Sequence, residues 1–181
     1  MELRFKLYAK SFLVYGVISG IALFLWNSFD TENMNFETKV YIIVTAWVIT
    51  SVSSAFSQIK SVERLKNSKL TTKDFSVFQT EYLNQNIPID YIFQLLKSNE
   101  ITKRWALTIH KSMIRGKTNI TISSWGEKVK IKSSDNKIII ESKPVLRTAV
   151  FDNGKNLKNV KLIKKIIENA QTILKNKKNN L

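Results

Sequence analysis

The sequence predicts an α+β fold, with an N-terminal transmembrane helical hairpin followed by a small domain that contains an antiparallel β-meander and a C-terminal amphipathic helix. Three patterns favour it: two long apolar runs near the N-terminus, alternating apolar and polar residues in the middle of the chain, and a helical apolar stripe near the C-terminus. We expect three segments: the hairpin at 1–58, a helical connector at 59–100 and a basic α+β domain at 101–181.

Two uncharged apolar runs, at about residues 12–29 and 40–57, dominate the N-terminal third. A membrane-spanning helix needs roughly 17 to 25 mostly apolar residues, and both runs fall near that length. The first run ends without the small-residue cleavage pattern of a signal peptide. A soluble core would have to bury two helices that are apolar on every side. We therefore predict two membrane spans.

The charges that flank the runs predict the orientation of the hairpin. Basic residues precede the first run and follow the second, whereas acidic residues dominate the connecting loop: Arg4, Lys6, Lys10, Lys60, Arg64, Lys66 and Lys69 against Asp30, Glu32 and Glu37. Lys and Arg gather on the cytoplasmic side of short membrane loops. We expect a bacterial inner-membrane protein with both termini in the cytoplasm.

Small and hydroxylated residues recur four apart in both runs. They are Gly16 and Gly20 in the first, and Ala46, Thr50 and Ser54 in the second. Such residues let helix backbones approach closely in lipid. The two faces could pack on each other within one chain, or hold a second copy or the span of a partner. No ionisable residue lies inside either run, which argues against an ion transporter.

The connector carries a helical pattern. The apolar stripe of the second span continues to about Leu65, and Pro88 opens a short helix. Between them, four apolar residues recur at helical spacing and predict a further helix: Phe75, Phe78, Tyr82 and Leu83.

From Arg104 to Lys143 the apolar period changes to two, which predicts an antiparallel meander. The expected strand segments are 105–110, 120–123, 128–132 and 137–142, with a turn at 133–136 and an end at Pro144. After the polar turn 151–156, apolar residues recur on one side of a helix to Leu174, with lysines mostly on the other. This helix could cover the sheet or lie on the membrane.

The positive charge is concentrated in one part of the chain. Residues 1–58 carry no net charge, so the whole excess of +15 lies in 59–181. Lys128, Lys130 and Lys132 fall on one strand face, about 6.5 to 7 Å apart. With Lys137, Lys143 and Arg147, they form a candidate surface for anionic lipid headgroups or a protein partner. The alternative is an ordinary solvated sheet face.

The sequence lacks the residues and motifs that metal binding, catalysis and specific nucleic-acid binding usually require. The chain has no cysteine and a single histidine, His110, so we expect no metal site and no cofactor. The turn Asp152–Asn156 lacks the spacing of a phosphate loop, and we expect no enzyme activity. The charge would suit nucleic acid, but no motif of a nucleic-acid-binding domain accompanies it.

Two membrane helices, then SSWGEKVKIKSSDNKIIIESKP and FDNGKNLKNVKLIKKI, resemble small bacterial two-span membrane proteins with a pleckstrin-homology-like cytoplasmic domain. The resemblance covers roughly Trp105 to Leu174. It implies a curved antiparallel sheet closed by a C-terminal helix, and binding or scaffolding without catalytic residues.

The sequence therefore leads us to expect an integral membrane binding or scaffolding protein, an accessory subunit whose basic module engages a protein partner or anionic lipid. Two alternatives remain open. The chain could be a membrane-tethered nucleic-acid-binding protein, or its spans could form an oligomeric pore or effector.

Overall fold

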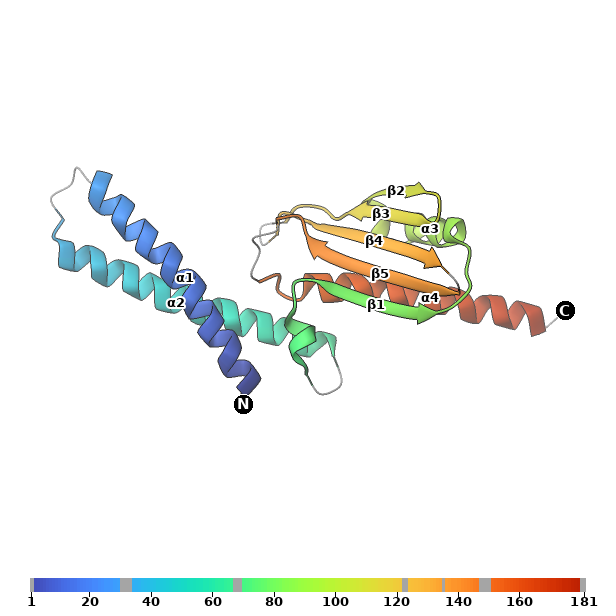
Figure 1. Ribbon diagram of the computed structural model, residues 1–181, viewed down its shortest axis with the longest axis horizontal. Coiled ribbons are helices and arrows are strands. Elements are labelled where there is room, and N and C mark those ends of the chain that lie inside the picture. The colour runs from blue at the N-terminus through green and yellow to red at the C-terminus, as the bar shows by residue number, and fades with distance from the viewer. Residues whose placement is uncertain are drawn as a thin grey trace. The chain divides into compact units, whose positions relative to one another are not determined.

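The structure, a computed structural model, describes residues 2–29, 34–66, 70–121, 124–134, 136–146 and 151–179. The chain forms two compact units, Met1–Thr72 and Lys73–Leu181. The first consists of two long helices, and the second combines an antiparallel sheet with helices (Figure 1). The predicted α+β class and the predicted order of helices before sheet are confirmed.

The first unit is a hairpin of α1 (Glu2–Phe29) and α2 (Phe36–Leu65). Both helices are long and apolar enough to cross a membrane, and α2 ends at Leu65 as the sequence predicts. In the most apolar window of each, only 6% of α1 and 11% of α2 is buried. Core helices of a soluble protein are mostly buried, so this exposure favours a lipid environment.

Polar contacts hold the two helices together along their length. Near the chain's N-terminus, Arg4 forms an ion pair of 2.5 Å with Glu63. Further along, the Ser11 hydroxyl donates to the Ser51 carbonyl at 2.7 Å. Residues early in α1 thus meet residues late in α2, which fixes an antiparallel arrangement. The N-terminus and the C-terminal end of α2 lie at the same end of the hairpin.

The second unit is built on a five-stranded antiparallel sheet with the order β1-β5-β4-β3-β2. The strands are β1 (Gln79–Asn84), β2 (Ala106–His110), β3 (Met113–Lys117), β4 (Glu127–Ser134) and β5 (Lys137–Pro144). Short 3₁₀ helices occupy η1 (Thr72–Phe75) and η2 (Thr102–Arg104). The β4–β5 hairpin and its end at Pro144 agree with the prediction.

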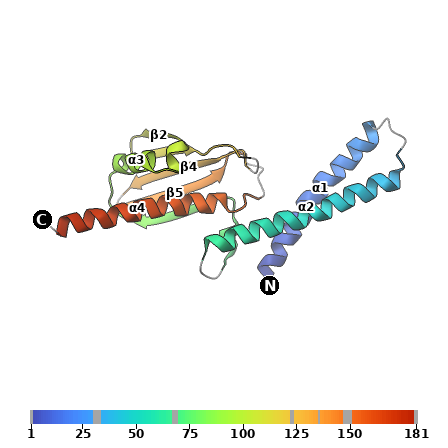
Figure 2. The same cartoon turned by 180° about the vertical axis from the view of Figure 1, so that it is seen from behind.

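Two helices, α3 (Ile89–Ser98) and α4 (Lys155–Asn179), lie on one face of this sheet (Figure 2). The apolar residues of that face and of both helices form the core, and many of them are fully buried: Ile92, Leu96, Ile114, Ile131, Ile138, Ile140, Val160, Ile163 and Ile167. The C-terminal helix therefore covers the sheet, one of the two placements that the sequence allowed.

A buried polar network anchors the start of α4 to β5. The Asp152 carboxylate accepts hydrogen bonds from the backbone N–H of Gly154 at 3.0 Å and of Asn156 at 2.9 Å, as a helix N-cap does. The side-chain amide oxygen Oδ1 of Asn156 accepts from the Ser142 hydroxyl on β5 at 2.6 Å. Gly154 has a φ of 69°, which favours glycine. The polar turn is thus a structural joint.

Three local predictions are wrong. Residues 79–84 are expected in a helix but form β1, because backbone pairing with β5 outweighs the helical spacing of the apolar residues. Tyr82, one of those apolar residues, is exposed. The helical connector at 59–100 therefore fails as one segment, and the units divide after Thr72. No strand is predicted at 113–117, where the structure has β3. The strand is expected at 120–123 instead, but Ile120 lies in a loop, and residues 122 and 123 lie outside the described residues.

Candidate functional site

One face of the sheet carries a dense group of cations. The strand register aligns Lys117, Lys128 and Lys143 in one row across β3, β4 and β5. The next row contains Arg115, Lys130 and Glu141. We call this surface the basic sheet face and define it by seven residues: Arg115, Lys117, Lys128, Lys130, Lys132, Lys137 and Lys143.

This face lies opposite α3 and α4. On β4, Val129 and Ile131 point into the core and are 3% and 0% exposed, so the alternating residues Lys128, Lys130 and Lys132 point the other way. Figure 1 views the sheet from this side, with the two helices behind the strands. The predicted separation of apolar and lysine faces on this strand is therefore confirmed.

The arrangement of charges on this face opposes stability. Lys128 lies directly across from Lys117 on one side and from Lys143 on the other, and Arg115 lies across from Lys130. Like charges directly opposite each other on neighbouring strands are destabilising, by roughly 0.2–1 kcal/mol per pair. The face carries three such pairs, which makes it a candidate surface for binding an anion.

One carboxylate lies among these cations. Glu141 approaches Lys130 at 3.8 Å, and both side chains are partly exposed, so the pair contributes little to stability. Around them is a hollow of about 420 Å³, lined by Arg115, Lys128, Lys130, Glu141 and Lys143 together with the backbone of their strands. The hollow offers space for a phosphate group among four cations.

Five of the six binding residues expected from the sequence belong to this face: Lys128, Lys130, Lys132, Lys137 and Lys143. The sixth, Arg147, lies outside the described residues. Arg115 and Lys117 are not among the residues expected from the sequence, because no strand is predicted at 113–117, where the structure has β3. The alternation of Met113, Arg115 and Lys117 with Ile114 and Gly116 is the signal that would have found them.

The small residues of the hairpin have different surroundings. Gly16 faces the Trp47 indole, where an added Cβ would lie 3.2 Å from the ring. Gly20 has no atom within 4 Å of that position, and Ala46 and Thr50 are exposed. The Thr50 hydroxyl donates to the Ala46 carbonyl of its own helix at 2.7 Å. Ala46 and Thr50 are thus outside the contact between α1 and α2.

The contact between the helices uses other residues as well. Trp47 donates from its indole N–H to the Phe12 carbonyl at 2.9 Å, and the two rings meet edge to face at 5.7 Å between centroids. The Ser54 hydroxyl donates to the Tyr15 hydroxyl at 2.9 Å, so this predicted packing residue does reach α1. Gly16 and Ser54 therefore lie in the intramolecular contact.

Among the described residues, no three His, Asp or Glu side chains are grouped so that they could hold a metal ion. His110 lies at the end of β2, exposed, on the same side of the sheet as the basic sheet face. The arrangement that the structure offers is therefore an array of cations suited to binding an anion.

Fold and site together define a class: an α+β chain with two candidate membrane-spanning helices and a cationic sheet face. No protein-family model matches the chain, and no curated protein or solved structure matches it significantly.

Proposed function

We propose that this is a membrane-anchored binding protein whose basic sheet face binds the anionic lipid headgroups of the membrane that holds the hairpin. The seven cations of that face, with one carboxylate among them, carry the proposal. A protein of the inner membrane with both termini in the cytoplasm would keep its positive unit beside anionic lipid.

The expected strength of this interaction is substantial. Each Lys or Arg close to an anionic membrane surface contributes about 1 kcal/mol, and the attraction falls off within a Debye length of about 8 Å at physiological salt. Seven cations on one sheet face can approach a flat surface together. The hairpin also removes most of the entropic cost of association, because it keeps the two surfaces at high effective concentration.

The experiment compares the full-length protein in nanodiscs of neutral lipid and of lipid with about a third anionic headgroups. Brief acetylation followed by mass spectrometry measures how reactive each lysine is. We expect Lys128, Lys130, Lys132 and Lys143 to lose reactivity severalfold in the anionic nanodiscs and to regain it at high salt. Lys165 on α4 lies outside the basic sheet face and serves as the internal control.

Equal reactivity of the face lysines in the two lipids would contradict the proposal. If a copurifying protein protects the same lysines in neutral lipid, the partner is a protein and the protein acts as an accessory subunit. If added RNA or DNA protects them, with binding that falls steeply as salt rises, the alternative of a nucleic-acid binder replaces the lipid proposal. The pleckstrin-homology-like resemblance remains a prediction.

A further inference from the structure

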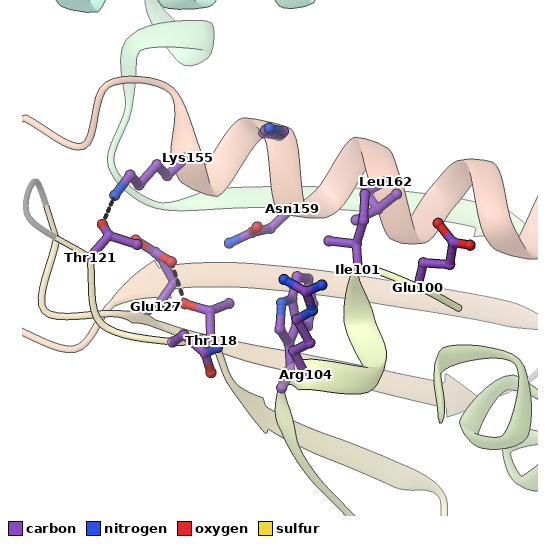
Figure 3. A pocket seen from close by; sticks show the side chains of 12 residues that line it. Glu100, Ile101, Arg104, Thr118, Thr121, Glu127, Lys155, Asn159 and Leu162 are labelled. Carbon is purple, nitrogen blue, oxygen red and sulfur yellow. Dashed lines mark hydrogen bonds between the residues drawn. The ribbon is translucent and has the colours of Figure 1, made fainter. Parts of the chain in front are cut away.

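A pocket of about 400 Å³ lies beside the start of α4 (Figure 3). Its walls come from η2, from the loops that adjoin β3 and β4, and from one stripe of α4. The described lining residues are Glu100, Ile101, Arg104, Trp105, Thr118, Asn119, Thr121, Glu127, Lys155, Lys158, Asn159 and Leu162. They include none of the seven residues of the basic sheet face, so the pocket is a separate site.

The helix α4 presents cations where its own dipole is also positive. Lys155, Lys158, Asn159 and Leu162 follow helical spacing and line the pocket together. Lys155 and Lys158 lie in the first two turns, and no acidic residue lies in the first turn. Cations near a helix N-terminus oppose the macrodipole, whereas an anion there is favourable. The Asp152 carboxylate caps this end of α4 and offsets part of its dipole, so the attraction for a further anion comes mainly from the lysine side chains themselves.

Arg104 adds a second source of positive charge from the opposite wall. Figure 3 shows its side chain rising from η2 toward α4, in the middle of the pocket near Asn159. Neither the Arg104 guanidinium nor the Lys158 ammonium forms an ion pair within the described part of the chain. A guanidinium is well suited to hold a phosphate or carboxylate through two parallel hydrogen bonds.

The two ends of the pocket differ in chemistry. At one end the Glu127 carboxylate, 4% exposed, accepts hydrogen bonds from the hydroxyls of Thr118 and Ser124. Its negative charge repels an anion from that end. At the other end Ile101 and Leu162 offer apolar surface, with the exposed Glu100 carboxylate beside them (Figure 3). Carboxylates at both ends repel an anion, so an anion is confined to the middle, and an apolar body is favoured against Ile101 and Leu162.

We propose that this pocket binds a small organic anion. Arg104 and Lys158 hold its phosphate or carboxylate, and Ile101 and Leu162 pack against its ring or other apolar body. This site is independent of the basic sheet face, which meets a flat surface. The protein then carries two anion sites, one for a membrane surface and one for a soluble small molecule.

The test is isothermal titration of the full-length protein in nanodiscs of neutral lipid at low salt. The probes are AMP and benzoate, which combine a ring with a phosphate or a carboxylate. Adenosine and inorganic phosphate serve as half-ligands of AMP, and acetate serves as the half-ligand of benzoate. We expect AMP or benzoate to bind at least tenfold more tightly than its own half-ligands, and the better of the two identifies the anion.

Variants assign the binding to this pocket. Arg104→Gln and Lys158→Gln each remove one cation from an exposed side chain, and we expect each to weaken binding by about tenfold or more, since hydrogen bonds to charged groups are strong. Lys103→Gln and Lys165→Gln remove cations that are also exposed but do not line the pocket, and we expect no change. Lys130→Ser on the basic sheet face should also leave binding unchanged.

Three results would overturn the proposal. The first is no binding of AMP or benzoate at millimolar concentration. The second is that inorganic phosphate binds as tightly as AMP and acetate binds as tightly as benzoate, which would show that Ile101 and Leu162 contribute nothing. The third is an equal loss of binding in Lys130→Ser and Arg104→Gln, which would indicate general attraction of anions to a basic protein. Failure of lysine protection on the basic sheet face would leave these results untouched.

Discussion

Each of the two units has one surface that no other described element of the same unit covers. These two surfaces differ in chemistry. On the hairpin the surface is apolar: Leu13, Phe24 and Tyr41 are each at least 70% exposed. On the sheet it is mainly cationic, although Tyr82, Met113 and Ile139 also lie on this face, and most apolar residues lie on the side that α3 and α4 cover. The first surface is of the kind that lipid covers, whereas the second is of the kind that attracts anions. Under the proposed function, the hydrocarbon interior of a bilayer covers the first surface and its anionic headgroups bind the second.

The largest expected effect comes from breaking the contrast between the two faces of β4. Ile131→Ala empties a fully buried site and should destabilise the second unit by about 2–5 kcal/mol. Lys130→Ala, the neighbouring residue on the open face, should change stability by less than about 1 kcal/mol. Urea unfolding of the nanodisc-embedded protein, followed by tryptophan fluorescence, measures both. Similar losses for the two variants would show that the face assignment is wrong.

The next largest effect is a difference in hairpin stability between substitutions at the two glycines of α1, Gly16 and Gly20. Gly16→Leu forces a side chain against the Trp47 indole and should destabilise the hairpin by about 1–3 kcal/mol. Gly20→Leu introduces the same side chain into open space and should leave the hairpin intact. Titration with SDS, followed by circular dichroism, compares them. A greater loss from Gly20→Leu would place the main contact of α1 on a second copy or a partner's span.

A smaller effect is expected at the joint between sheet and helix. Asp152→Ala removes the carboxylate that accepts from the N–H groups of Gly154 and Asn156, and should cost about 0.5–2 kcal/mol. Hydrogen exchange at those two amides should become faster, while exchange in β4 changes little. Asp152→Asn keeps one acceptor oxygen and should retain part of the protection. Unchanged hydrogen exchange at these amides in Asp152→Ala would show that Asp152 does not cap α4.

The smallest effect has the opposite sign. Lys128→Thr removes a charge that lies between Lys117 and Lys143, and should stabilise the second unit by about 0.2–1 kcal/mol. Lys132→Thr is the matched control, because Lys132 lies across from Met113 and Ile139 and has no cation directly opposite. We expect its stability to stay nearly constant. A destabilised Lys128→Thr would contradict the claim that this face opposes folding.

The sequence was most informative where apolar residues were numerous and regular. The long runs predicted both helices of the hairpin, and the alternation around Val129 and Ile131 predicted β4 and its lysine face. In β1, only Gln79 and Leu83 are buried, so the strand has little alternation of its own and depends on backbone pairing with β5. Pairing of that kind is long-range, and no local pattern encodes it.

The site was only partly predictable for the same reason. Strand β3 contains one fully buried side chain, Ile114, and it lies between two neighbours that complete its hydrogen bonding. Without β3, Arg115 and Lys117 could not be assigned to the lysine face. The pocket beside α4 draws on residues from Glu100 to Leu162 in several segments, so only the folded chain brings Arg104 and Lys158 to the same cavity.

The most direct test of the account is a measurement of which side of the membrane each unit occupies. Since the chain has no cysteine, Met34→Cys and Lys137→Cys each introduce a single thiol, one beside the start of α2 and one on the basic sheet face. A membrane-impermeant maleimide added to intact bacterial spheroplasts should label Met34→Cys at once and Lys137→Cys only after permeabilisation. Labelling of both thiols before permeabilisation, or recovery of the protein in the soluble fraction without detergent, would contradict the account.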